Sequence, residues 1–265
     1  MPVLYEVNGQ PYEGYFVSPS PNAALVLLVH DWDGLTDYEV KRANMLADMG
    51  YAVFAADLFG KGVRPTEVVD KKQHTGELYK DRAKLRALIQ GAVDEAKKMG
   101  ANTGNAVVMG YCFGGAAVLE YARSGADVKG HVTFHGGLST PEGQDYSKAK
   151  GQVLILHGTA DSAITMTDFA ALANEMEAHG VRHEMISYSG APHAFTVFGS
   201  ARYQEEADRK GMALIERARI DPAGMVEIYQ TMADQENRAV PVSSAIRFVS
   251  RRPARSTSPS SGLVH

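Results

Sequence analysis

The sequence has a single cysteine and a single tryptophan among its 265 residues. One cysteine excludes an internal disulfide, and without a cysteine cluster there is no signature of a zinc site. We expect neither a metal nor another cofactor. No apolar run approaches the roughly 20 residues of a membrane span, and residues 1–6 lack the basic and apolar regions of a signal peptide. These features predict a soluble cytoplasmic protein with a reduced thiol.

Charge of either sign is also modest. The chain has 27 Lys and Arg against 31 Asp and Glu, a net charge of −4 and a pI near 6.1. This balance gives no reason to expect nucleic acid or an anionic membrane as a partner. A small molecule is the expected partner. The sequence does not determine the oligomeric state, for which a monomer is the simplest expectation.

Apolar segments alternate with helical patterns, which is typical of α/β proteins. Hydrophobic residues make up 45% of the chain, enough for one large domain. After a hairpin that Asn8-Gly9 predicts, strands are expected at residues 24–29, 52–56, 106–109, 131–134, 153–156 and 183–188. Helices are expected from residue 36 or 37, over 76–99 and over 166–179. The alternation predicts a mostly parallel sheet with helices on both faces.

The end of the chain has a different composition. From residue 238 onward it holds five arginines, no acidic residue and a run rich in serine. We expect helices at 203–219 and 223–235, a single α/β-hydrolase domain over 1–237, and a basic, disordered tail over 238–265.

The cysteine lies where an apolar strand meets a helix. Cys112 stands between Gly110 and Gly114 in a G-x-C-x-G motif. Glycines at these positions leave room for a tight turn that exposes the side chain between them. The following helix N-terminus favours a thiolate. The motif predicts a nucleophile, and its structural alternative is a buried cysteine that fills apolar space.

An aspartate and a histidine follow the cysteine in the chain order of α/β-hydrolase triads. Asp161 comes after the apolar segment 153–156, and His193 lies in a loop of small residues. A thiol needs a base to attack a carbonyl, which His193 supplies, while Asp161 fixes the tautomer of His193. The structural alternatives are a helix cap for Asp161 and a surface position for His193.

Backbone N–H groups of two residues are candidates for an oxyanion hole. Phe113 directly follows the cysteine, and Trp32 lies in the loop after the strand at 24–29. Beside it, Asp31 is a candidate partner for the thiol proton. Histidines at strand ends match no zinc-binding spacing, so we expect no metal among them: His30, His135 and His157.

Five segments together resemble the dienelactone hydrolase family, the carboxymethylenebutenolidase-like members of the α/β-hydrolase superfamily. The resemblance spans about residues 12–204 and is carried by residues 30–35, 56–61, 110–115, 157–161 and 192–195. It implies an α/β-hydrolase fold and a triad of Cys112, Asp161 and His193. It also implies that Asp31 stands where dienelactone hydrolases proper have a glutamate paired with the resting cysteine.

The resemblance further implies where a substrate binds. Dienelactone hydrolases proper hold a substrate carboxylate with two arginines. This chain has Lys61 at the first position, which keeps the charge but lacks the bidentate fork, and Val197 at the second. Arg202 is near the second position in sequence. Aromatic residues beside the motifs are expected to line the pocket, among them Phe59, Tyr111 and Phe195.

The predicted function is hydrolysis of a small lactone or ester through a thioester acyl-enzyme on Cys112. A different acyl substrate, either an ester or a thioester, is the first alternative. A redox-sensing thiol without catalysis is an alternative from another class, although the chain offers no second cysteine to resolve a sulfenic acid.

Overall fold

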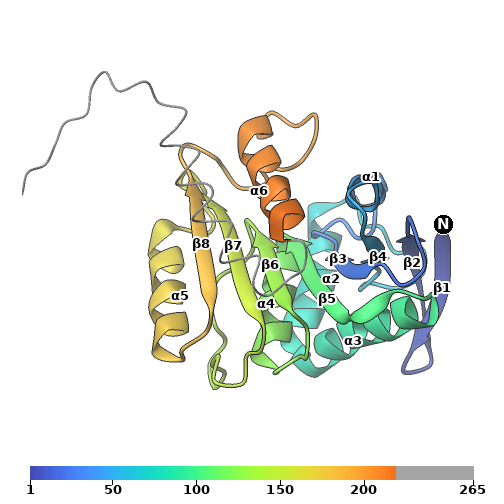
Figure 1. The fold of residues 1–265 in the computed structure, drawn as a ribbon. Coiled ribbons are helices and arrows are strands. Elements are labelled where there is room, and N and C mark those ends of the chain that lie inside the picture. Colours follow the sequence, from blue (N-terminus) through green and yellow to red (C-terminus); the bar gives the residue numbers. More distant parts are fainter. Residues whose placement is uncertain (219–265) are drawn as a thin grey trace, which may run out of the picture. The chain divides into compact units, whose positions relative to one another are not determined.

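Eight strands form one sheet in the order β1-β2-β4-β3-β5-β6-β7-β8. A computed structural model describes residues 1–218 (Figure 1). The strands are β1 (Pro2–Val7), β2 (Gln10–Val17), β3 (Ala24–Val29), β4 (Ala52–Ala56), β5 (Asn102–Tyr111), β6 (Gly130–Phe134), β7 (Gln152–Gly158) and β8 (His183–Tyr188). From β4 to β8 all neighbours are parallel, whereas β1 and β2 add an antiparallel edge. The predicted mostly parallel sheet is confirmed.

The hairpin between β1 and β2 turns at Asn8 and Gly9. Their φ angles are 53° and 73°, as a two-residue hairpin turn of the primed type requires. Tyr5 then pairs with Tyr12 in the antiparallel register. The hairpin that the sequence predicts is therefore confirmed.

Helices cover both faces of the sheet (Figure 1). On one face lie α1 (Asp37–Asp48) and α6 (Glu205–Ala218), and on the other α3 (Arg82–Lys98) and α4 (Phe113–Arg123). α5 (Met166–Ala178) packs through Leu172 and Met176 into a core cluster with β7. α1 begins after the N-cap Thr36, as the sequence predicts.

The single helix predicted over 76–99 is wrong. Two helices occupy this region, α2 (Val68–Lys80) and α3, and they separate at Asp81. Asp81 has φ −110° and ψ 77°, which are not helical, and its side chain accepts a hydrogen bond from the N–H of Lys84 at 2.9 Å. The aspartate therefore caps α3, and α2 is free to take another direction.

Central strands are apolar on both sides because helices cover both faces. All five residues of β4 are buried, and so are residues 106–111 at the end of β5. Such a sheet places the loops after its parallel strands at one edge, where ligands bind in folds of this kind.

Arg42 joins α1 to α6 inside the protein. The side chain is fully buried, and its Nη2 donates to Asp208 Oδ1 at 2.8 Å and to the Thr196 carbonyl oxygen at 2.6 Å. The guanidinium also lies over the rings of Tyr38 and Phe198, at 5.2 and 4.0 Å from the centroids. α6 is thus held by a buried ion pair with cation–π support.

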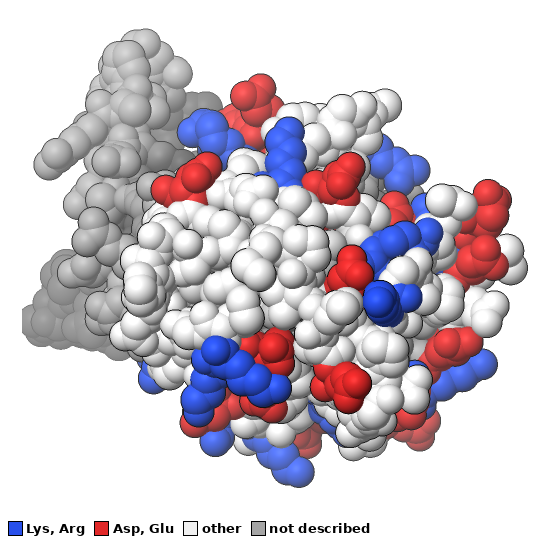
Figure 2. Space-filling model, turned by 90° about the vertical axis from the view of Figure 1, so that its right-hand side faces the viewer, with Lys and Arg blue, Asp and Glu red and all other residues white. Residues whose placement is uncertain are grey.

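The surface shows mixed charge. On the side of the molecule that Figure 2 presents, basic and acidic side chains are interspersed around an uncharged area. None of the helices within residues 1–218 combines the length and apolarity needed to cross a membrane. The predicted helix at 223–235, the domain limit at 237 and the predicted tail at 238–265 lie outside the described residues.

Replacing Asp208 by alanine should lower the free energy of unfolding by about 3–5 kcal/mol, because it leaves a buried guanidinium without its counter-ion. Urea denaturation measures this change. Glu206→Ala is the matched control in the same helix, since Glu206 makes an exposed pair with Lys210 at 2.9 Å whose loss should have a much smaller effect. Equal effects of the two substitutions would contradict a structural role for the buried pair.

Candidate active site

Cys112 lies at a strained turn between β5 and α4. Its φ is +51° and its ψ −113°, an unusual conformation for a residue with a Cβ. A Cβ at Gly114 would meet the carbonyl groups of Val29 and His30, and one at Gly110 would meet the backbone of Gly114. These close approaches explain both glycines of the motif. The sulfur is half-buried, not enclosed as the apolar-filler alternative requires.

The structure brings Cys112, His193 and Asp161 together in one hydrogen-bonded chain. His193 Nε2 lies 3.1 Å from the Cys112 Sγ, and His193 Nδ1 lies 2.7 Å from Asp161 Oδ2. The other carboxylate oxygen of Asp161 accepts hydrogen bonds from the N–H groups of Ala163 and Ile164, both at 2.9 Å. Asp161 therefore does not cap α5, whose N-cap is Thr165.

The surroundings of His193 favour its charged form. Burial opposes the imidazolium, but hydrogen bonds to Asp161 and Cys112 outweigh it and raise the pKa of His193 to about 10. Burial also opposes ionisation of Asp161, yet the hydrogen bond from His193 keeps its pKa below the usual value. Both neighbours of the imidazole thus favour its protonated form.

His30 anchors the loop that follows β3. Its Nε2 accepts a hydrogen bond from the Leu58 N–H at 3.1 Å, so its protonated Nδ1 donates to the Asp31 carbonyl oxygen at 2.6 Å. Burial lowers the pKa of His30 to about 4, in agreement with a neutral ring. Because N–H and C=O point in opposite directions in a trans peptide, this bond turns the Trp32 N–H away from His30.

Two carboxyl groups lie next to this loop. Asp31 Oδ1 accepts from the Asp33 N–H at 2.8 Å; burial raises the pKa of Asp31 to about 6, while the charge of His193 lowers it. Glu39 is almost fully buried in the first turn of α1, and its Oε2 accepts from the N–H and hydroxyl of Thr36, both at 2.8 Å. Burial, and then the charge of Asp31, raise the pKa of Glu39 to about 8.

α2 supplies residues beside the site that the sequence pattern did not indicate. Lys71 Nζ makes an ion pair with Asp33 Oδ1 at 2.6 Å and lies 5.2 Å from the Trp32 ring centroid. The ring of Tyr79 packs edge-to-face against that of Phe113, with centroids 5.4 Å apart, and burial followed by the charge of Cys112 raises the pKa of Tyr79 to about 12. Helical periodicity shows neither contact, since both depend on the direction of α2 after the break at Asp81.

Beside His193 lies a polar contact between the segments that follow β6 and β8. The ring of His135 packs against that of His193 with centroids 5.2 Å apart, and its Nε2 lies 2.8 Å from the Thr196 hydroxyl. Burial, and then the charge of His193, hold the pKa of His135 well below its ordinary value. A neutral ring at this place supports the imidazole of His193 without sharing its proton.

Of the residues predicted to bind substrate, Phe59 packs on residues beside the site. Its ring packs against those of Phe113 and His30, at 5.7 and 4.6 Å. Tyr111 and Phe195 are 0% exposed, so a substrate at the sulfur cannot touch them without rearrangement. The two side chains were predicted to line the pocket. They lie instead beneath its surface, where they support the residues that a substrate can reach.

Lys61 and Arg202 are held by main-chain contacts outside the hydrogen-bonded chain of Cys112, His193 and Asp161. The N–H of Lys61 is bonded to the Pro11 carbonyl oxygen of β2 at 3.1 Å, near the antiparallel edge of the sheet. The exposed Arg202 lies in a turn before α6, where its N–H donates to the Ser200 hydroxyl. The main-chain contacts of the two residues, and not their places in the family motif, determine where they lie.

The three strand-end histidines have separate partners. His30 and His135 make the contacts described above, and His157 Nε2 lies 2.9 Å from the Ile164 carbonyl oxygen. Within residues 1–218, no group of three or more His, Cys, Asp or Glu side chains is arranged to hold a metal ion.

Comparisons with known proteins point to one family over most of the chain. The model of the dienelactone hydrolase family matches residues 12–216. Protein usf of Aquifex pyrophilus and the Aquifex aeolicus protein named "Putative carboxymethylenebutenolidase" are each 25% identical over 199 residues, which cover 73% of this chain and 85% of the relative.

Solved structures give the same fold. A dienelactone hydrolase-like promiscuous phosphotriesterase from metagenomic libraries aligns with a TM-score of 0.76 and 28% identity, over 83% of this chain and 96% of that protein. An esterase from Thermogutta terrifontis aligns with a TM-score of 0.61 and 18% identity, over 82% and 90%. The predicted α/β-hydrolase fold is confirmed by these alignments.

Glu39→Gln should flatten the dependence of stability on pH. The folded-state pKa of Glu39 is about 8 against an ordinary 4.5, so its stabilising effect is complete below pH ~4.5 and is lost as the pH rises through ~8. Glutamine keeps the capping box with Thr36 but has no proton to lose. Urea unfolding at several values between these limits should show a steeper decline for the wild type.

The matched control is Asp168→Asn, in the exposed capping box of α5 that Asp168 forms with Thr165. Its carboxylate has a lowered pKa and is ionised throughout that interval in both states, so this substitution should leave the slope unchanged. The same decline in wild type and Glu39→Gln would contradict a protonated Glu39.

Proposed function

Because this chain belongs to the dienelactone hydrolase family and is a carboxylic ester hydrolase of the carboxymethylenebutenolidase type, we propose that Cys112 is its nucleophile. Asp161 and His193 complete the triad, and the substrates are small, neutral esters or lactones. The observation that carries this proposal is the hydrogen-bonded chain from Asp161 Oδ2 through His193 to the Cys112 Sγ, with lengths of 2.7 and 3.1 Å.

In the first half of the reaction, His193 holds the proton of the thiol and the sulfur attacks the ester carbonyl as a thiolate. The tetrahedral oxyanion accepts hydrogen bonds from the N–H groups of Phe113 and Trp32. Phe113 is the first residue of α4, where N–H groups have no partner within the helix. When the oxyanion collapses, the carbon–oxygen bond breaks, and the alcohol leaves with the proton of His193.

In the second half, His193 takes a proton from water, and the hydroxide attacks the thioester on Cys112. The carbon–sulfur bond breaks, the carboxylic acid leaves, and the sulfur is again a thiolate. Because His193 keeps the proton that it took from water, the thiolate–imidazolium pair forms again. Asp161 stays ionised throughout and stabilises the imidazolium. Asp31 contributes a negative charge near His193, and this attraction favours the same ion pair.

Neutral substrates are proposed because the charges next to the sulfur do not favour an anion. Asp31 and Asp33 border the loop, and Lys71, the cation brought to this loop, is paired with Asp33 at 2.6 Å. Lys61, which the family resemblance suggested as an anion clamp, has its main chain bonded to Pro11 of β2. A carboxylate on the substrate would therefore meet Asp31 and Asp33 at this loop, where the lysine is already paired.

Cys112→Ala should reduce kcat/KM by at least about a thousandfold for every substrate that the wild type cleaves, because the triad has lost its nucleophile. A panel of aryl esters, small lactones and thioesters tests this and identifies the preferred acyl group. Rapid acid quenching of the wild type should trap an acyl group on Cys112, visible by mass spectrometry. Turnover by the alanine variant close to the wild-type rate would overturn the proposal.

For a lactone acid and its neutral methyl ester, the wild type should show no preference for the acid in kcat/KM. Asp33→Asn frees Lys71 from its ion pair, so the acid should gain about tenfold relative to the ester, a change of about 1.4 kcal/mol. Adding Lys71→Met to Asp33→Asn should cancel that gain and serves as the control. A preference for the acid above about a hundredfold in the wild type would mean that another cation reaches the substrate.

A further inference from the structure

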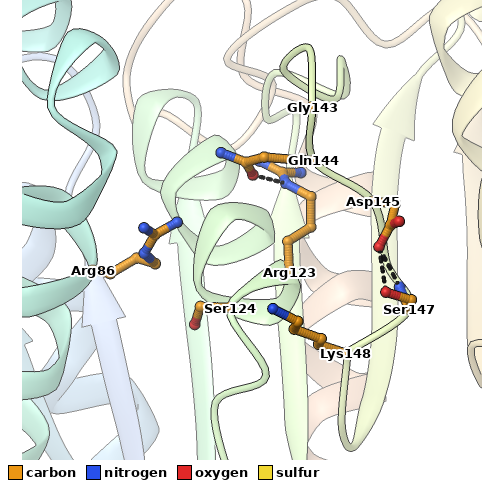
Figure 3. Close-up of a pocket in the computed structure, with 8 residues that line it drawn as sticks. All are labelled: Arg86, Arg123, Ser124, Gly143, Gln144, Asp145, Ser147 and Lys148. Atoms are coloured by element: carbon orange, nitrogen blue, oxygen red, sulfur yellow. Dashed lines mark hydrogen bonds between the residues drawn. The ribbon is translucent and has the colours of Figure 1, made fainter.

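A cavity lies away from Cys112, between α3, α4 and the loop that joins β6 to β7. Its volume is about 390 Å³, within the range of small-ligand sites. Figure 3 shows Arg86 reaching toward α4 from one side and Lys148 extending from the loop on the other. Polar groups line it: Arg86, Arg123, Ser124, Gly143, Gln144, Asp145, Ser147 and Lys148.

The arginine at the centre of this cavity is held in place. Arg123 Nε donates to Gln144 Oε1 and its Nη1 to the Tyr146 hydroxyl, both at 2.9 Å, and Nη2 donates to Glu120 Oε2 at 3.0 Å. These bonds use three of the five N–H hydrogens of a guanidinium. The Arg123 fork is thus ordered before any ligand binds, which reduces the entropy lost on binding.

Positive charge exceeds negative charge around the cavity. One fully buried carboxylate, Glu120, is shared by Arg123, by Arg86 at 2.6 Å and by Arg82 at 3.6 Å. Lys148 adds a fourth positive charge and Asp145 a second negative one. Two unit charges therefore remain uncompensated in this group.

The titration of Arg82 agrees with this excess. Burial lowers its pKa, and the positive charges of Arg123 and Arg86 lower it further, against the attraction of Glu120. A guanidinium that other guanidiniums repel in this way indicates a site where an additional anion would be stabilised.

The cavity is distinct from the proposed catalytic site. Cys112 is the N-cap of α4, whereas Arg123 is its last residue and Ser124 its C-cap. Eleven helical residues separate the two ends, which is about 16 Å at 1.5 Å per residue. A ligand of the size of the cavity therefore cannot occupy both places.

We propose that this cavity binds a small molecule with two or more anionic oxygens, as phosphate or carboxylate groups. The guanidinium forks of Arg123 and Arg86 match the geometry of both groups, and Lys148 adds a point charge. The hydroxyl groups of Ser124 and Ser147 already donate to the Tyr121 carbonyl oxygen and to Asp145 Oδ1, so the cationic side chains supply the donors for a ligand. This inference does not depend on the proposed function, because none of its residues belongs to the triad.

Isothermal titration of the full chain tests the proposal with pyrophosphate and, separately, with citrate, at constant ionic strength in chloride. Saturable binding of at least one probe is expected, with a Kd below about 1 mM. Lys148→Glu should weaken it at least about tenfold. Lys150→Glu changes charge equally on the same exposed loop but outside the cavity lining, and should leave Kd within about threefold.

The two probes separate the possible groups, since binding of pyrophosphate alone indicates phosphate and binding of citrate alone indicates carboxylate. Cys112→Ala should bind the probe as the wild type does, whatever its esterase activity. No saturable binding of either probe up to about 10 mM, or equal weakening by the substitutions at Lys148 and Lys150, would overturn the proposal.

Discussion

The close approach of α4 to the end of β3 is the constraint on which the site depends. At Gly114 the helix backbone touches the carbonyl groups of Val29 and His30 so closely that no Cβ fits. This contact sets the turn at Cys112 and also fixes the start of the loop that carries Trp32. The proposed nucleophile and both proposed oxyanion donors therefore have their relative positions set by backbone packing, which a side chain cannot disturb without moving the sheet.

Much of the fold could be predicted because the strands carry strong local signals. β3 and β4 are continuous apolar runs, and the Asn8-Gly9 turn has a conformation that few other residue pairs adopt readily. The break between α2 and α3 could not be predicted in the same way. Residues on both sides of Asp81 suit a helix, and the aspartate ends one helix only because its side chain caps the next.

The proximity of Cys112, Asp161 and His193 could be predicted from the sequence because each follows a recognisable strand, and parallel strands end at one edge of the sheet. The charged residues that other elements bring to the site could not be predicted from the sequence. Lys61 and Lys71 are both lysines after β4, yet the turn at Lys61 is tied to β2 while α2 carries Lys71 back to Asp33. In the sequence, Glu39 can be recognised only as a residue that caps a helix. Its electrostatic interaction with Asp31 depends on how α1 packs, which the sequence does not show.

The ion pair between Arg42 and Asp208 joins residues 166 positions apart, and this separation bears on synthesis at the ribosome. At roughly 5–20 residues per second, about 8–33 s pass between the appearance of the arginine and that of its counter-ion. During this interval Arg42 also lacks Thr196 and Phe198, the other late residues that it contacts in the folded protein. The position of α1 is therefore fixed by this cluster only after residues 196–208 have been made.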